Sequence, residues 1–304
     1  MDPASVSSVA ARARTENFPV ASLLFPRAVR PHLRAVYGFA RLVDILGDEF
    51  LGERLDNAER SLFRRSALAG GVGKAHASSE TTSTSDVVGN RLAALDELER
   101  EVDACYGGEP TWEVMRALQP TICDCSLPRE PFLRLIEANR IDQRVSEYET
   151  WADLKDYCVH SADPVGRLVL GVLGRAGDPE AVALSDNVCT GLQLVNFLQD
   201  VPRDLALGRV YLPAEDRRRF GVTELSEPNE PLRRLLEFEA ERARGLLASG
   251  DELGRRLGGR VGRAVALFGR GGLAALEALE RADWDIFNGR PRPSRARLAL
   301  AAIR

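Results

Sequence analysis

Two aspartate pairs at helical spacing are the residues of this chain best suited to chemistry. Asp44 and Asp48 lie in the run Tyr37-Gly-Phe-Ala-Arg-Leu-Val-Asp-Ile-Leu-Gly-Asp48, and Asp200 and Asp204 lie in the run Gln193-Leu-Val-Asn-Phe-Leu-Gln-Asp-Val-Pro-Arg-Asp204. Residues four apart on an α-helix share a face, so each pair concentrates negative charge. The other positions of both runs are mostly apolar, which is typical of buried helices. We therefore expect both pairs to face the interior of the protein.

Further polar side chains extend the same two faces. Tyr37 and Arg41 lie two turns and one turn before Asp44, and Gln193 and Asn196 stand in the same relation to Asp200. Like charges about 6 Å apart, at an effective dielectric near 20, repel by on the order of 2–3 kcal/mol. Cations relieve that repulsion. The alternative is a solvated acid pair on a charged helix surface, but the apolar surroundings of both pairs argue against it.

Carboxylates on facing helices favour a magnesium site that holds a phosphorylated ligand. Magnesium prefers oxygen ligands, and it typically takes one or two carboxylates together with substrate phosphate oxygens. If the rest of the cavity is apolar, the ligand has a diphosphate head and a hydrocarbon body, as in a prenyl diphosphate. Bound magnesium would make diphosphate a better leaving group, and a dry cavity would protect a carbocation from water.

Composition excludes several other classes of protein. The chain has 304 residues, 44% of them hydrophobic, and a net charge of −4, so no basic excess favours a nucleic-acid partner. The five cysteines are odd in number and form no C-x-x-C pair, which predicts free thiols and a cytoplasmic protein. We see no signal peptide and no run long enough to span a membrane, so contact with a membrane is at most peripheral.

Helical periodicity dominates the whole chain and predicts an all-α fold. The predicted helices cover 29–50, 91–105, 110–118, 130–147, 151–162, 164–175, 178–203, 229–257, 259–285 and 293–303. Breaks are predicted at turn residues such as Pro120 and Gly208. Residues from about 67 to 90 are small, polar and without period, so we interpret them as a flexible insertion in a single domain spanning 1–304.

At three motifs the sequence resembles the squalene/phytoene synthase family. Residues 37–49 resemble its first aspartate-rich motif, and residues 193–213 resemble its second, including the Gly208-Arg209-x-Tyr-x-Pro tail. The run from Tyr157 to Gly166 matches the segment in which the family places an active-site tyrosine. Runs at 16–22 and 135–143 are most similar to bacterial hydroxysqualene synthases. The chain departs from the family pattern at Ile45, where a second aspartate is common, and at Asp163, where asparagine is expected.

This resemblance implies an isoprenoid-synthase helical bundle with a central cavity. It implies magnesium at Asp44, Asp48, Asp200 and Asp204, and an active-site role for Tyr157. It also implies a diphosphate held by Arg41 with help from Asn17 and Arg209, and further substrate contacts from Tyr37, Gln193 and Asn196. The implied reaction converts presqualene diphosphate to hydroxysqualene, with a water quench and without NADPH. Enzymes upstream and downstream in the squalene pathway are then expected partners.

Two other functions stay open at this point. One is the head-to-head condensation of prenyl diphosphates to presqualene diphosphate, squalene or phytoene, which uses the same aspartate frame. The other is a non-catalytic assembly or binding role, although the retention of all four aspartates argues against it.

Overall fold

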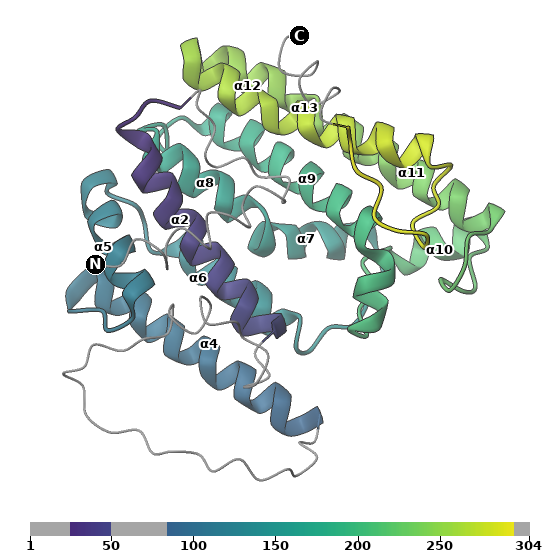
Figure 1. Ribbon diagram of the computed structural model, residues 1–304, viewed down its shortest axis with the longest axis horizontal. Coiled ribbons are helices and arrows are strands. Elements are labelled where there is room, and N and C mark those ends of the chain that lie inside the picture. Colours follow the sequence, from purple (N-terminus) through teal and green to yellow (C-terminus); the bar gives the residue numbers. More distant parts are fainter. Residues whose placement is uncertain (1–24, 50–83, 295–304) are drawn as a thin grey trace.

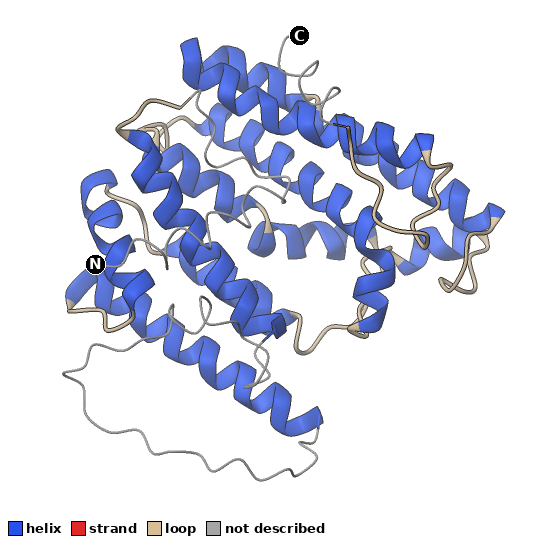
Figure 2. Ribbon diagram, in the orientation of Figure 1, coloured by secondary structure: helices blue, strands red, loops and turns tan. Residues whose placement is uncertain are grey.

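The computed structural model describes residues 25–49 and 84–294 of the chain. In these residues every regular element is a helix (Figure 2), and the β structure is limited to isolated bridge residues such as the pair Glu147 and Val210. The predicted all-α class is therefore confirmed. Asn17 and most of the predicted insertion lie outside the described residues.

The helices follow one another through the described ranges with short connections. In chain order they are α2 (Val29–Asp44), the π-helix η1 (Ile45–Glu49), α4 (Thr84–Gly107), α5 (Glu113–Cys125), α6 (Glu130–Ile141), α7 (Trp151–Ser161), α8 (Asp163–Val172), α9 (Pro179–Ala206), α10 (Ala214–Phe220), α11 (Glu230–Leu247), α12 (Ser249–Leu257) and α13 (Gly259–Arg281).

Helix α9 lies in the middle of the bundle (Figure 1). It packs against α8 on one side and against α11, α12 and α13 on the other, while α2 packs against α5 and α8. Fully buried side chains such as Phe39 and Leu42 of α2 and Leu198 of α9 carry this packing. The apolar faces recognised in the sequence are thus the faces that build the core.

Several predicted boundaries are wrong, each for a local reason. Helix 29–50 changes to π geometry at Ile45, and α5 continues through Pro120 instead of ending there. Residues on both sides of Pro120, such as Met115 and Ile122, are buried, and that burial offsets the cost of about 3 kcal/mol of an interior proline. The predicted helix 229–257 is divided at Ala248, next to the point where Gly250 closely approaches Gly269 of α13.

Two short segments escaped prediction. Residues 84–90, the end of the predicted insertion, form the first turns of α4. Helix α10 has seven residues, three of them consecutive arginines, and is too short to show a periodic pattern.

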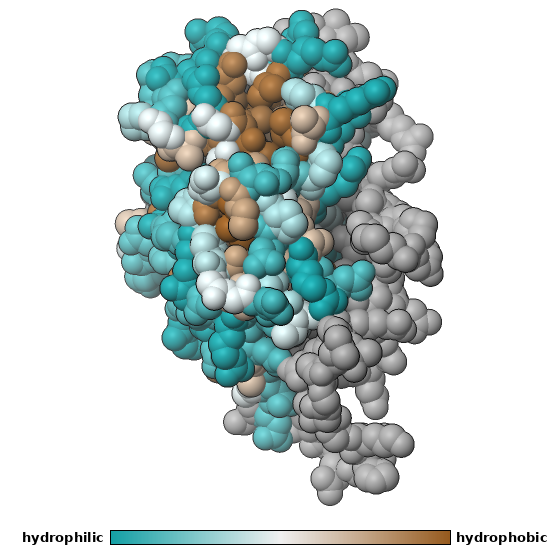
Figure 3. All heavy atoms as spheres, turned by 90° about the vertical axis from the view of Figure 1, so that its left-hand side faces the viewer, coloured by the Kyte–Doolittle hydropathy of each residue, from teal (hydrophilic) through white to brown (hydrophobic). Residues whose placement is uncertain are grey.

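One face of the molecule gathers hydrophobic residues. Figure 3, which looks at the left-hand side of Figure 1, shows two such groups surrounded by hydrophilic residues.

None of the described helices is both long enough and apolar enough to cross a membrane. Peripheral contact with a membrane stays a prediction.

Candidate active site

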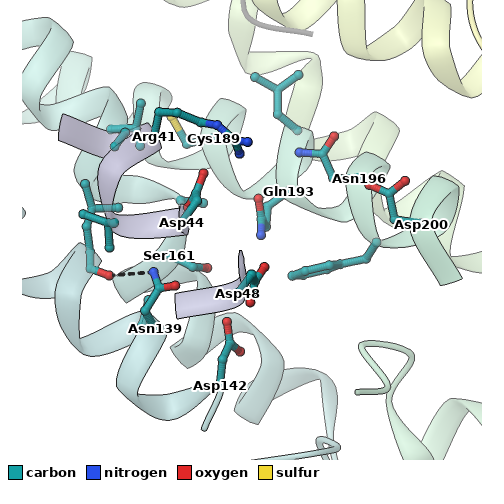
Figure 4. A pocket seen from close by; sticks show the side chains of 18 of the residues that line it. Arg41, Asp44, Asp48, Asn139, Asp142, Ser161, Cys189, Gln193, Asn196 and Asp200 are labelled. Carbon is teal, nitrogen blue, oxygen red and sulfur yellow. Dashed lines mark hydrogen bonds between the residues drawn. The ribbon is translucent and has the colours of Figure 1, made fainter. Parts of the chain in front are cut away.

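A cavity of about 390 Å³ lies between α2, α8 and α9, within the size range of small-molecule sites. Every predicted site residue in the described ranges lines it: Tyr37, Arg41, Asp44, Asp48, Tyr157, Gln193, Asn196, Asp200, Asp204 and Arg209. Figure 4 shows Asp44 and Asp48 on one wall facing Gln193, Asn196 and Asp200 on the other. The two aspartate motifs, about 150 residues apart in sequence, thus meet at one site.

The π-helix η1 places Asp48. Its wider turn rotates Asp48 away from the position that a continued α-helix would give it. Gly47 allows this close packing, because a Cβ there would lie 1.9 Å from Oδ1 of Asn139 on α6. Arg91 donates to the carbonyl oxygen of Asp48 at 2.6 Å, and Gln143 donates to that of Gly47 at 3.1 Å. Side chains from α4 and the end of α6 therefore satisfy carbonyls that the helix leaves open.

Arginines neutralise one member of each aspartate pair. Arg209 forms an ion pair with Asp48 at 2.6 Å, and its side chain is only 8% exposed. Arg290, which follows α13, forms an ion pair with Asp200 at 3.1 Å and also donates to Asn196 at 3.2 Å. The polar end of the cavity is thus a mixture of carboxylates and guanidinium groups, a combination that suits a diphosphate with metal ions.

Burial raises the pKa of both carboxylates of the second pair, Asp200 and Asp204. Burial, together with the nearby charge of Asp200, raises the pKa of Asp204 to about 7. Burial also raises the pKa of Asp200, although Arg290 and Arg203 oppose that shift. A bound cation would favour the ionised form of both carboxylates.

The residues present fit magnesium bound through a ligand, not a closed metal site. In the part of the chain that the structure describes, no three acids, histidines or cysteines come close enough to hold a metal ion by themselves. The four aspartates instead lie on two walls, with carboxylate oxygens of raised pKa on α9. Magnesium commonly binds in this way, with one or two carboxylates and the rest of its shell from phosphate and water.

Tyr157 belongs to a group of aromatic side chains around one carboxylate. Its hydroxyl donates to Oδ2 of Asp142 at 2.8 Å, and the hydroxyl of Tyr211 donates to Oδ1 of the same residue at 2.8 Å. Tyr211 stacks on Phe197 with ring centroids 4.1 Å apart. Burial raises the pKa of Asp142 to about 6, against the opposing effects of Arg209 and the two hydroxyl donors.

Some lining residues were not predicted as site residues. Asp142 lies in the run 135–143 that supported the resemblance, but nothing in its spacing pairs it with a second acid. Arg290 lies within the last predicted break, between the predicted helices 259–285 and 293–303, and so has no periodic neighbours. Ser161 lies beside the tyrosine motif, and its buried Oγ has no hydrogen-bond partner among the described residues. These residues are distant in sequence from at least one of the two aspartate motifs, so sequence spacing does not reveal that they line the same cavity.

The two departures from the family pattern lie away from the cavity lining. Ile45 is 1% exposed and packs in the core, so an aspartate at this position of the present fold would not face the cavity. Asp163 is 5% exposed and accepts a hydrogen bond from Thr190 at 2.9 Å. Burial raises the pKa of its carboxyl to about 7.

A helical bundle around a cavity with two acidic walls and an apolar remainder defines the class of prenyl-diphosphate-processing synthases. The chain belongs to the squalene/phytoene synthase family, whose sequence profile, described as "Squalene/phytoene synthase", matches residues 11–297. Among curated relatives, the hydroxysqualene synthase of Zymomonas mobilis is 30% identical over 276 residues, covering 88% of this chain and 80% of its own length. The 15-cis-phytoene synthase of Synechocystis is 31% identical, covering 64% of this chain and 63% of its own length.

Solved structures agree with this assignment. The crystal structure of squalene synthase HpnC from Alicyclobacillus acidocaldarius is 41% identical, with a TM-score of 0.72 and coverage of 93% of this chain and 95% of its own. A dehydrosqualene synthase structure, 22% identical, has a TM-score of 0.77 over 98% of this chain and 94% of its own, and supports the fold. The predicted isoprenoid-synthase bundle is therefore confirmed.

Proposed function

We propose that this enzyme converts presqualene diphosphate to hydroxysqualene with release of diphosphate. The observation that carries the proposal is the pair of acidic walls, Asp44 and Asp48 opposite Asp200 and Asp204, in a cavity that is also lined by arginines and by apolar side chains. The similarity to hydroxysqualene synthases over most of the chain supports the choice within the family.

The polar end of the cavity binds the diphosphate in this proposal. Arg41, Arg203 and Arg209 line that end and offer guanidinium donors to phosphate oxygens. Magnesium held by the aspartates and the diphosphate would neutralise the negative charge that develops on the leaving group. Because Arg209 already pairs with Asp48, it holds that carboxylate in place before the substrate arrives.

The apolar end of the cavity holds the hydrocarbon and limits access of water. Its lining comes from α2, α8 and α13: Leu33, Val36, Val165, Val169 and Phe268. Carbocations in such surroundings meet only the nucleophiles that the protein positions. In hydroxysqualene formation that nucleophile is water, so the reaction consumes no NADPH.

A second candidate is the head-to-head condensation of two prenyl diphosphates. The similarity to phytoene synthases favours it, since the 15-cis-phytoene synthase of Synechocystis, at 31% identity, is about as similar to the chain as the hydroxysqualene synthase of Zymomonas mobilis, at 30%. The two candidates differ in substrate, which makes them separable by experiment.

The test supplies purified enzyme with presqualene diphosphate or farnesyl diphosphate, with magnesium, in water labelled with heavy oxygen. We expect only presqualene diphosphate to be consumed rapidly, with labelled oxygen in the hydroxysqualene formed. Addition of NADPH is expected to leave the product unchanged, and a chelator to stop the reaction. Squalene that appears only with NADPH, or comparable consumption of farnesyl diphosphate, would favour the second candidate.

A further inference from the structure

Asp142 is the buried charged residue of the cavity that the proposed chemistry does not yet use. Its side chain is 9% exposed, and both of its carboxylate oxygens accept hydrogen bonds from tyrosines that line the cavity. Arg209 lies close by, with its guanidinium 3.8 Å from Oδ2 and donating to the Asp142 carbonyl oxygen at 3.3 Å. The carboxylate therefore lies at the cavity wall, and both of its oxygens are occupied by the hydroxyls of Tyr157 and Tyr211.

These hydrogen bonds decide what the tyrosines offer to a molecule in the cavity. A hydroxyl has one proton, and in Tyr157 and Tyr211 that proton points to Asp142. The oxygen of each tyrosine then presents only lone pairs to the cavity, so it accepts hydrogen bonds there. A water molecule that donates to such an oxygen keeps its own lone pairs free for attack on an electrophile.

We propose that Tyr157 and Asp142 form the proton path for water capture at the end of the reaction. A lone pair on the water oxygen forms the new C–O bond to the carbocation. One proton of that water passes to the Tyr157 oxygen as the Tyr157 proton passes to Oδ2 of Asp142. The carbocation and water thus become an alcohol, and the released proton ends on Asp142. This inference rests on the water quench of the proposed function.

The surroundings of Asp142 suit a temporary proton acceptor. Arg209 favours the ionised carboxylate before capture, whereas burial favours the protonated form and raises the pKa of Asp142 to about 6. Neither form is then strongly disfavoured near neutral pH. Asp142 does not touch the substrate in this scheme, so it is a positioning residue that acts through Tyr157.

The test compares product partition in Asp142→Asn with that in the unmodified enzyme. Asparagine keeps the volume and one acceptor oxygen but cannot take up a proton under these conditions. Single-turnover reactions with presqualene diphosphate and magnesium are measured for diphosphate released and hydroxysqualene formed. We expect diphosphate release within about threefold of the unmodified rate, and a fall of about tenfold or more in the ratio of alcohol to diphosphate. Tyr157→Phe, which retains Asp142, is expected to give the same fall, and the double variant no more.

Asp163→Asn is the matched control, because Asp163 is a second buried aspartate that does not line the cavity and accepts its hydrogen bond from Thr190, not from a tyrosine. It is expected to retain the unmodified ratio. Thermal unfolding of each variant checks the fold, and if Asp142→Asn does not fold, Tyr157→Phe decides. An unchanged ratio, or equal loss of both products, would overturn the relay. Failure of the unmodified enzyme to make any hydroxysqualene would instead overturn the proposed function.

Discussion

The two aspartate pairs are alike in sequence but are held in different ways. The first pair spans the change from α2 to the π-helix η1, and Asp48 is fixed by an ion pair with Arg209 and by backbone contacts to Arg91. The second pair lies within α9, a continuous helix of 28 residues, and burial raises the pKa of Asp204 to about 7. Geometry is the main constraint on the first wall, whereas the main feature of the second is burial, which raises the pKa of both of its carboxylates against the opposing charges of nearby arginines.

Because of this difference, two kinds of substitution should impair the site: those that displace a carboxylate and those that remove its charge. On the wall of α2, a change that leaves every carboxylate in place is expected to impair the enzyme if it moves Asp48. On the wall of α9, both aspartates lie in one helix that continues through Pro202, so removal of charge is the more informative change.

Removal of one carboxylate from either wall is expected to have the largest effect. Asp44→Asn and Asp200→Asn keep the side-chain volume but remove charge needed to bind a divalent ion, so turnover should fall by a factor on the order of 10² or more. The measurement is diphosphate release against magnesium concentration. Asp124→Asn, an exposed aspartate on α5, is the control and should retain full activity. Full activity in only one of the two variants would show that the walls do not act together.

The first wall should also fail when its geometry alone is changed. Gly47→Ala puts a methyl group 1.9 Å from Oδ1 of the buried Asn139, so η1 or α6 must move and Asp48 with it. A displacement of about 1 Å in a catalytic group can cost up to 10²-fold, so we expect a loss of tenfold or more in kcat/KM. In Gly38→Ala, on the preceding helix α2, the added methyl group meets only Val114 at 3.9 Å, so this variant should retain activity. Equal activity of the two variants would contradict the geometric role of η1.

The sequence predicted the helices because amphipathic periodicity reflects burial, and burial decided most of them. It missed the π-turn at Ile45 because that turn depends on tertiary contacts: Gly47 against Asn139, and the carbonyl of Asp48 against Arg91. Pro120 misled for the same reason, since the core on both sides of it holds α5 together. Local propensity carries no information about such contacts.

The prediction of site residues was limited in a similar way, to residues that share a helix face. Residues that share a helix face with another polar residue, such as Gln193 and Asp200, were found from spacing and do line the cavity. Asp142 and Arg290 were not found, because their partners are far away in sequence: Tyr211 for the first and Asp200 for the second. Helical spacing in the sequence identifies polar residues on one helix, whereas contacts between different helices are known only from the fold.

A smaller effect is expected from the side chain that supports η1 from behind. Arg91→Met keeps a long side chain but removes the donor to the Asp48 carbonyl, and burial of the guanidinium already lowers the Arg91 pKa. Loss of one such hydrogen bond is worth about 1 kcal/mol, so kcat/KM should fall roughly fivefold. The half-saturating magnesium concentration should rise, which a purely structural role would not cause. Arg100→Met, an exposed arginine of α4, should change neither quantity.

The smallest effect on turnover is expected at Asp163, which can be compared with Asp204 of the second wall. Asp163 and Asp204 both have a pKa raised by burial to about 7, but only Asp204 lines the cavity. Because the folded protein then binds more protons than the unfolded chain between about pH 4 and 7, the charge on Asp163 costs stability progressively as pH rises through that range.

Asp163→Asn retains an acceptor for the Thr190 hydroxyl and removes that cost. The variant should equal the unmodified protein in unfolding free energy near pH 4 and exceed it by up to about 4 kcal/mol at pH 8, since one pKa unit corresponds to about 1.4 kcal/mol, with unchanged turnover. Denaturant unfolding at the two pH values measures the difference. Asp204→Asn should gain stability with the same pH dependence but lose turnover. Loss of turnover in Asp163→Asn would contradict a purely structural role for Asp163. A raised pKa alone would then not distinguish structural from catalytic buried acids.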